Sequence, residues 1–166
     1  SGKWISFLGA DDIYLPNAIE NYVLMINKYK NVQYVSSKVS LISEEGEYLK
    51  TVGAAWSWPY FKKNMNVAHV GSLHNRSMFN EKGLFNQNFK IAGDYEFLLR
   101  FNSALRTLYL NNVTVEMMDG GISTKNSKVF FESALAKNAH TKRGIFIIYF
   151  EAIHSLIKWK LRGLIK

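Results

Sequence analysis

The sequence predicts an α/β fold in which helices flank a mixed sheet and an amphipathic helix closes the chain. Segments that are apolar or β-branched alternate with segments of helical periodicity. A turn at residues 44–47 joins two strand-like segments directly, so the sheet cannot be purely parallel. The final segment, residues 145–164, has helical periodicity and a wide apolar surface.

The first half of the chain carries the clearest strand signals. Residues 3–8 form an apolar run typical of a buried strand, and Pro16 suits the first turn of a helix that continues to about residue 30. We expect further strands at 33–43, 48–52 and 69–74, and short helices around Pro59 and at 76–82, where Gly83 ends the helix.

The second half is mostly helical. A helix begins at Asp94, and its core stripe is formed by Phe97, Leu98, Phe101 and Leu105. Residues 107–110 and 113–118 are predicted as two strands, and 119–123 as a loop. Two helices follow, at 127–142 and 145–164.

The composition restricts the class of protein. The chain has 166 residues, 48% of them hydrophobic and 20% charged, which indicates a globular domain with a core. It has no cysteine, which excludes disulfides and thiolate metal sites and fits a reducing compartment. We find no secretory signal in residues 1–8 and expect a cytoplasmic location.

Two adjacent carboxylates follow the first strand. One interpretation is that Asp11 or Asp12 caps the next helix. The other is that the pair holds a divalent cation together with a diphosphate. Two acids in a row after an apolar strand favour the cation, because unpaired carboxylates at that place are costly.

Asp94 is the second candidate for chemistry. It can cap the helix that it begins, or it can act as a general base that the rigid helix aims. A carboxylate at a helix N-terminus is stabilised as the anion, so it can accept a proton near neutral pH. Spacing alone leaves both interpretations open.

Four segments in this order resemble the family 2 glycosyltransferases with the GT-A fold. Residues 7–12 with Pro16 resemble the metal-binding motif, and 69–79 the strand and helix beside the active site. Residues 83–100 are similar to the segment that carries the catalytic base, and 120–123 to a later glycine loop. The resemblance covers residues 2–123 and identifies the chain as the C-terminal part of such a catalytic domain.

The resemblance implies an inverting transfer of a sugar from a nucleotide-diphospho-sugar, a UDP-sugar, to a saccharide or lipid-linked acceptor in bacterial surface polysaccharide synthesis. Asp11 matches the ligand of Mn²⁺ or Mg²⁺, Asp12 its supporting neighbour, and Asp94 the base. Gly9 departs from the family, which often has an acid there, so a second contact from that position is in doubt. The donor-binding half is expected before Ser1, which predicts that this chain is inactive alone.

Other residues are weaker candidates. The resemblance places His69, Gly71, Gly120 and Gly121 near the donor or acceptor pocket, and His140 matches an extra metal ligand of some relatives. Trp56 packs in the core or stacks under an acceptor sugar, and core packing is favoured. If 69–74 is a regular strand, His69 and His74 face opposite sides and do not share a metal.

The basic charge is concentrated at the C-terminus. Residues 137–166 contain seven basic residues and one acid, which is +6 of the net charge of +8. This disfavours nucleic-acid binding, which prefers a basic face across the fold. We divide the chain into a catalytic part, 1–142, and a basic amphipathic helix, 143–166.

The tail helix has three candidate partners. It contacts the inner face of the plasma membrane, packs on its own domain, or pairs with a second copy in a homodimer. A rival to the enzyme hypothesis is a non-catalytic membrane-docking or assembly module of the same fold. The presence of Asp11, Asp12 and Asp94 together favours the enzyme.

Overall fold

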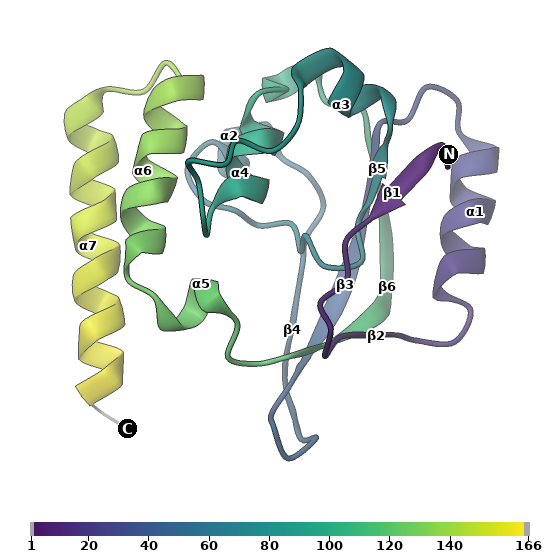
Figure 1. Cartoon of the computed structure of the whole chain (residues 1–166), viewed down its shortest axis with the longest axis horizontal. Helices are drawn as coiled ribbons and strands as arrows, with labels where there is room; N and C mark the ends of the chain where they lie inside the picture. The colour runs from purple at the N-terminus through teal and green to yellow at the C-terminus, as the bar shows by residue number, and fades with distance from the viewer. Residues whose placement is uncertain (1, 165–166) are drawn as a thin grey trace. The chain divides into compact units, whose positions relative to one another are not determined.

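In a computed structural model that describes residues 2–164, the chain divides into two units of helices and strands (Figure 1). The first unit contains residues 2–83 and 103–119, and the second contains 84–102 and 120–164. Each unit is described by itself. Together their elements confirm the predicted α/β class, with the strands in the first unit.

The first unit is built on a six-stranded mixed sheet. Its path runs β1-β5-β3-β6-β2, and β4 pairs with β3 outside this path. The β3–β6 pair is parallel and the remaining pairs are antiparallel, which confirms the mixed sheet. The strands are β1 (Trp4–Ser6), β2 (Ile13–Tyr14), β3 (Tyr34–Ile42), β4 (Tyr48–Val52), β5 (Leu73–Asn75) and β6 (Thr107–Met118).

The structure joins two predicted strands into one. Residues 107–110 and 113–118 belong to the single strand β6, in which Asn111 and Asn112 are exposed. The register against β3 shifts on either side of Lys38, so the parallel pairing absorbs three extra residues of β6 as a bulge. Two asparagines in a row are typical of a turn. Here β6 continues through Asn111 and Asn112 because it pairs with β3 on both sides of them.

Helix α1 (Ala18–Lys28) packs on the sheet through one buried face. Tyr22 is fully buried, and its hydroxyl is hydrogen-bonded to Ser37 Oγ at 2.8 Å and Thr114 Oγ1 at 2.9 Å. Tyr22 packs with Val35, Leu73 and Leu110 in the core of this unit. Helix α2 (Trp58–Phe61) and helix α3 (Ser77–Lys82) complete the unit.

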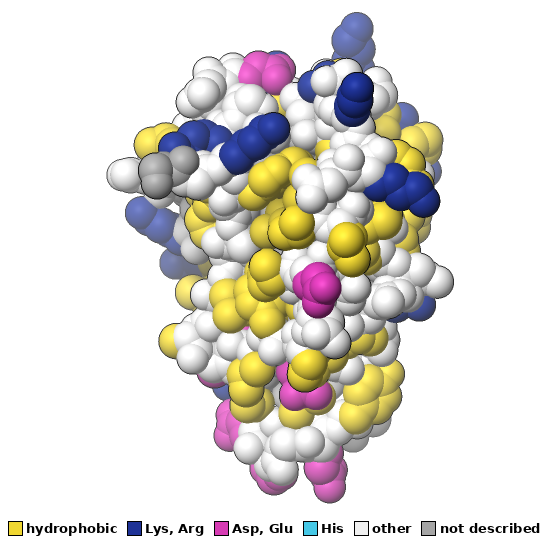
Figure 2. Space-filling model, turned by 90° about the vertical axis from the view of Figure 1, so that its right-hand side faces the viewer, with side chains coloured by type: hydrophobic (Ala, Val, Ile, Leu, Met, Phe, Trp, Pro, Cys, Tyr) yellow, Lys and Arg dark blue, Asp and Glu magenta, His cyan; other side chains and the backbone are white. Residues whose placement is uncertain are grey.

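The outer surface of α1 is apolar. Figure 2 views the molecule from the α1 side and shows a band of hydrophobic side chains there. Ile19, Val23 and Leu24 are the exposed large hydrophobic residues of this helix. Glu20 and Lys28 are exposed on the same helix, so the patch lies among charges of both signs.

The second unit contains α4 (Gly93–Leu99), α5 (Ile122–Lys125), α6 (Lys128–His140) and α7 (Ile145–Leu164), and the short helix η1 (Asn102–Ala104) lies at its boundary. Phe97, Leu98 and Phe101 are buried as predicted. Helices α6 and α7 lie side by side in Figure 1 and pack through a small core of Ala134, Ile148 and Ala152. Among the described residues, no helix is both long and apolar enough to cross a membrane.

Candidate functional site

The two adjacent carboxylates lie in the connection between β1 and β2. The Asp12 amide donates to the carbonyl of Gly9 at 3.3 Å, which closes a turn over residues 9–12. Strand β2 begins at the next residue and pairs with β6 opposite Glu116. The sheet therefore holds both ends of the connection, and the carboxylates are presented at its edge.

Asp12 is anchored and Asp11 is open to solvent. The Gly9 amide donates to Asp12 Oδ2 at 3.0 Å, and the Met118 amide donates to Asp12 Oδ1 at 3.2 Å. The Asp11 side chain is exposed. Two backbone donors thus fix one carboxylate, and its neighbour is left available to an external ligand. The supporting role of Asp12 and the metal-binding role of Asp11 stay predictions.

The same hydrogen bonds give a physical reason for the glycine at position 9. A Cβ built on Gly9 would lie 2.5 Å from Asp12 Oδ2 and 3.1 Å from Asp11 Oδ1. An acid at this position would require the Asp12 carboxylate to leave its present anchor. With glycine at position 9, the two adjacent carboxylates keep the arrangement that these hydrogen bonds give them.

The segment around Gly71 is tied to the start of the carboxylate connection. The Gly71 amide donates to the Phe7 carbonyl at 3.0 Å, and the Tyr14 hydroxyl donates to the Gly71 carbonyl at 3.3 Å. Gly71 has a φ of +73°, and a Cβ there would overlap the Val115 side chain. A residue with a side chain would therefore be strained at this turn. The two hydrogen bonds hold the turn beside the connection that carries the carboxylates.

The expected regular strand over residues 69–74 is not formed, so His69 and His74 do not face opposite sides; that they do not share a metal stays a prediction. Strand β5 begins only at Leu73, and residues 69–72 form a turn in which the Ser72 amide donates to the His69 carbonyl. The turn brings the rings of His69 and His74 to 5.1 Å between centroids, on the same side of the chain. Phe7 stacks on His69 at 5.4 Å.

His74 belongs to the core. It is fully buried, and burial, with a smaller contribution from the nearby His69, lowers its pKa to about 3. A neutral imidazole among aromatic rings is a packing element. His69, which is half-buried, stays the candidate for the pocket.

Trp56 lies in an aromatic cluster. Its ring centroid is 4.2 Å from that of Phe61, which is fully buried, and 6.4 Å from that of Trp58. This packing is the arrangement that the core interpretation expects. Contact between Trp56 and an acceptor sugar stays a prediction.

Asp94 lies in the second unit, in the first turn of α4. The helix begins at Gly93 with Ala92 as its N-cap residue, so of the two interpretations left open for Asp94, the N-cap is not the one that the structure has. Asp94 Oδ1 instead accepts a hydrogen bond from the adjacent Tyr95 amide at 2.7 Å. The side chain is half-buried at the positive end of the helix.

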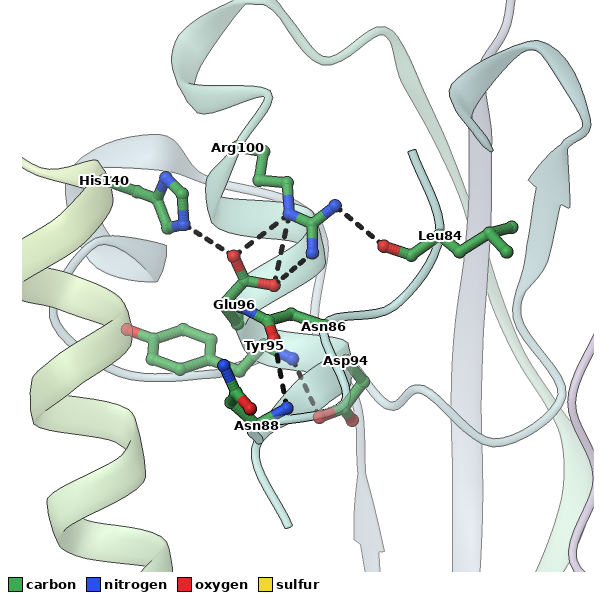
Figure 3. Close-up of polar contacts among 8 residues, drawn as sticks. All are labelled: Leu84, Asn86, Asn88, Asp94, Tyr95, Glu96, Arg100 and His140. Carbon is green, nitrogen blue, oxygen red and sulfur yellow. Dashed lines mark hydrogen bonds and ion pairs between the residues drawn. The ribbon is translucent and has the colours of Figure 1, made fainter. Parts of the chain in front are cut away.

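Glu96, two residues after Asp94, is a buried carboxylate whose partners lie around it. Arg100 donates to both of its oxygens, at 3.0 and 3.1 Å from Nε, and His140 Nε2 lies 2.6 Å from Oε1. Arg100 also donates to the Leu84 carbonyl at 2.9 Å. Figure 3 shows that Asp94 points away from this cluster.

The Glu96 cluster connects three segments of the second unit. Burial acts to raise the pKa of Glu96, but the hydrogen bonds from Arg100 and His140 outweigh it and lower the pKa. Sequence analysis did not single out Glu96, although Arg100 four residues later is a recognisable helical pair. His140 lies against Glu96 here, and its role as a metal ligand stays a prediction.

Glu132 of α6 holds the segment that leads into α4. Its Oε2 accepts hydrogen bonds from the Ile91 amide at 2.8 Å and the Ala92 amide at 2.9 Å. Burial acts to raise its pKa, but these backbone donors outweigh burial and lower it. Glu132 lies about 40 residues from the amides that it binds, so no local pattern reveals the contact.

The glycine pair after β6 begins α5. Gly120 has a φ of +100°, and a Cβ there would lie 2.7 Å from Lys125 Nζ. Gly121 is the N-cap residue of α5. The pair makes a turn that a larger residue at position 120 would strain, and its contact with a ligand stays a prediction.

Asp11 and Asp12 fit a divalent cation that takes its remaining ligands from water and from a bound phosphate group. Among residues 2–164, no group of three His, Asp or Glu side chains lies close enough to hold a metal by itself. The anchored Asp12 and the exposed Asp11 offer hard oxygen ligands of the kind that Mg²⁺ accepts, with water and phosphate oxygens as its other ligands.

Comparisons with known proteins indicate the kind of enzyme. The chain is 32% identical over 104 residues to an uncharacterized glycosyltransferase of Rickettsia felis, a match that covers 57% of this chain and 17% of the relative. It is 26% identical over 127 residues to a PGL/p-HBAD biosynthesis glycosyltransferase of Mycobacterium bovis, which covers 74% and 48% respectively. An uncharacterized glycosyltransferase of Rickettsia prowazekii is 25% identical over 137 residues, with 76% and 42% covered.

These similarities support a glycosyltransferase family for the chain. No model of a known protein family matches it. The chain spans less than half the length of these curated relatives.

Proposed function

We propose that this chain is the metal- and acceptor-binding part of an inverting, metal-dependent family 2 glycosyltransferase with a GT-A fold. The carrying observation is the exposed Asp11 beside an Asp12 that two backbone amides anchor. The similarity to named glycosyltransferases supports the reaction class. The donor is a UDP-sugar, and the acceptor is a saccharide or lipid-linked hydroxyl of a bacterial surface polysaccharide.

In this proposal Asp11 and Asp12 hold Mg²⁺ or Mn²⁺, which supplies positive charge to the diphosphate of the donor. Asp12 keeps its orientation through Gly9 and Met118. The backbone bonds therefore reduce the entropy that the site loses when a ligand binds.

Asp94 is the proposed base. The acceptor oxygen forms a bond to the anomeric carbon, the bond from that carbon to the diphosphate breaks with inversion, and the nucleoside diphosphate leaves. Asp94 takes the acceptor's hydroxyl proton on Oδ2, because Oδ1 is engaged by the Tyr95 amide. Glu132 holds the backbone amides just before Asp94, and the buried Glu96 pairs with Arg100 on the same helix.

Calorimetry with Mn²⁺ and UDP on the full-length protein that contains this chain tests the metal role. Asp11→Asn should weaken Mn²⁺-dependent UDP binding by about tenfold or more, because it removes one anionic ligand. The matched control is Glu44→Gln, which removes one exposed charge from the hairpin turn. Equal binding by wild type and Asp11→Asn would remove Asp11 from the site.

A further inference from the structure

We propose that the outward face of α7 docks on an anionic lipid surface. This inference concerns where the protein resides and is independent of the transfer reaction. It is carried by three properties of α7: its inner face is already packed, its outer face is apolar, and the residues around that face are cationic.

The inner face of α7 already has its partners. Ile148 and Ala152 are buried against Ala134 of α6. The indole Nε1 of Trp159 donates to the Thr124 carbonyl at 3.0 Å, which holds the C-terminal half of the helix to the segment before α6. The packing that stabilises this unit therefore does not require the opposite face.

The outer face carries a row of large apolar side chains. The side chain of Phe146 is 87% exposed and that of Phe150 is 71% exposed. Ile153, Ile157 and Leu161 continue the row with about half of each side chain exposed. The spacings of four, three, four and four residues place all five on one side of the helix. Contiguous apolar surface of this kind marks an interaction site.

The charges around this row are positive. Lys158, Lys160 and Arg162 are exposed on the C-terminal half of α7, and helical geometry places Lys160 and Lys158 on opposite borders of the row. Glu151 is the single acid of α7, and Arg143 neutralises it through a hydrogen bond of 2.8 Å. Among the described residues of α7, no acid is thus left to offset the three cations.

The positive charge around the apolar row indicates which partner covers this face of α7. A membrane with anionic headgroups offers apolar depth for the row and negative charge for its borders. A second copy of the chain would bring the same cations, so pairing of this face with itself would gain no charge complementarity. We therefore assign the face to a lipid surface.

The test is sedimentation of the full-length protein with vesicles. Wild type should bind vesicles that contain phosphatidylglycerol more tightly than pure phosphatidylcholine vesicles, and the difference should shrink at high salt. Phe146→Gln with Phe150→Gln should lower binding by about tenfold or more, because two exposed aromatic side chains no longer enter the lipid. The matched control is Ile19→Gln with Leu24→Gln on the α1 patch of Figure 2, which should bind as wild type does.

A second variant tests the charges independently. Lys158→Gln with Lys160→Gln should lower binding to anionic vesicles by about thirtyfold, and Lys50→Gln with Lys63→Gln, both exposed elsewhere, should leave it unchanged. Circular dichroism confirms that each variant is folded. Equal binding by the variants and wild type overturns the proposal. So does a dimer in analytical ultracentrifugation that Phe146→Gln with Phe150→Gln dissociates, because a second copy would then cover the face.

Discussion

The acidic residues of the two units differ in how far the protein satisfies them. In the first unit, Asp11 is exposed in the connection between β1 and β2. In the second, Glu96 is 3% exposed and bound by Arg100 and His140, and Glu132 is bound by two backbone amides. Asp94 lies between these extremes, half-buried and bound through one oxygen.

The difference separates carboxylates that build the fold from carboxylates that are available for chemistry. Glu96 accepts hydrogen bonds from the Arg100 side chain and pairs with His140, and Glu132 accepts hydrogen bonds from the backbone amides before α4. Asp11 and Asp94 retain capacity for a ligand or a proton. The sequence singled out Asp11 and Asp94, but the structural roles of Glu96 and Glu132 became visible only from their contacts. The predictions below test this distinction.

The largest effect is expected at Asp94. Asp94→Asn should lower the rate of sugar transfer by about a thousandfold, because an amide cannot accept the acceptor proton. The melting temperature should change little, because the amide oxygen can still accept the hydrogen bond from the Tyr95 amide. Turnover and thermal denaturation are both measured on the full-length protein that contains this chain. Activity near the wild-type level would end the assignment of Asp94 as the base.

Glu96 should show the opposite pattern, a large effect on stability. Glu96→Ala should lower the free energy of unfolding by about 3 kcal/mol, because it leaves the Arg100 guanidinium without its buried partner. The control is Glu81→Ala, whose exposed pair with Lys82 should contribute about 0.5 kcal/mol or less. Urea denaturation measures both. Similar losses in the two variants would contradict the distinction.

The pH dependence of stability should distinguish the units. Folded His74 stays neutral down to about pH 3, whereas an unfolded histidine takes up a proton near pH 6.5. Stability should therefore fall by up to about 1.4 kcal/mol per pH unit as the pH drops below 6.5. Glu96 and Glu132, whose pKa values are lowered from 4.5, stabilise the fold above about pH 4.5 and add to the loss as the pH falls further.

The variant His74→Phe separates these contributions. It should flatten the profile of unfolding free energy between pH 6.5 and 4.5 and leave the more acidic limb in place. Urea titrations at a series of pH values provide the measurement. An unchanged slope in the upper range would mean that His74 is not the titrating group.

The smallest effect is expected at Glu132. Glu132→Gln keeps one acceptor oxygen for the Ile91 and Ala92 amides, so it should cost only about 1 kcal/mol of stability. Amide hydrogen exchange at Ile91 and Ala92 should become faster than in wild type. Exchange that is unchanged at both amides would show that Glu132 does not hold this segment.

Much of the fold could be predicted from local patterns. The long helix at 145–164 and the hairpin around 44–47 agree with α7, β3 and β4 because apolar periodicity and turn residues act over a few neighbouring positions. Local patterns wrongly predicted a strand over residues 69–74, where β5 begins only at Leu73. The glycine at 71 makes a turn that depends on close packing against Val115, which lies in a different strand.

The sequence by itself determined the α/β class, the concentration of positive charge at the C-terminus, and the two carboxylate positions at Asp11–Asp12 and Asp94. Each of these is a property of composition or of a short segment. Tertiary structure decided that Asp12 is anchored by Met118, that His140 meets Glu96, and that Glu132 holds the amides before α4. These contacts join residues 40 or more positions apart, and only the packed fold brings such residues within hydrogen-bonding distance.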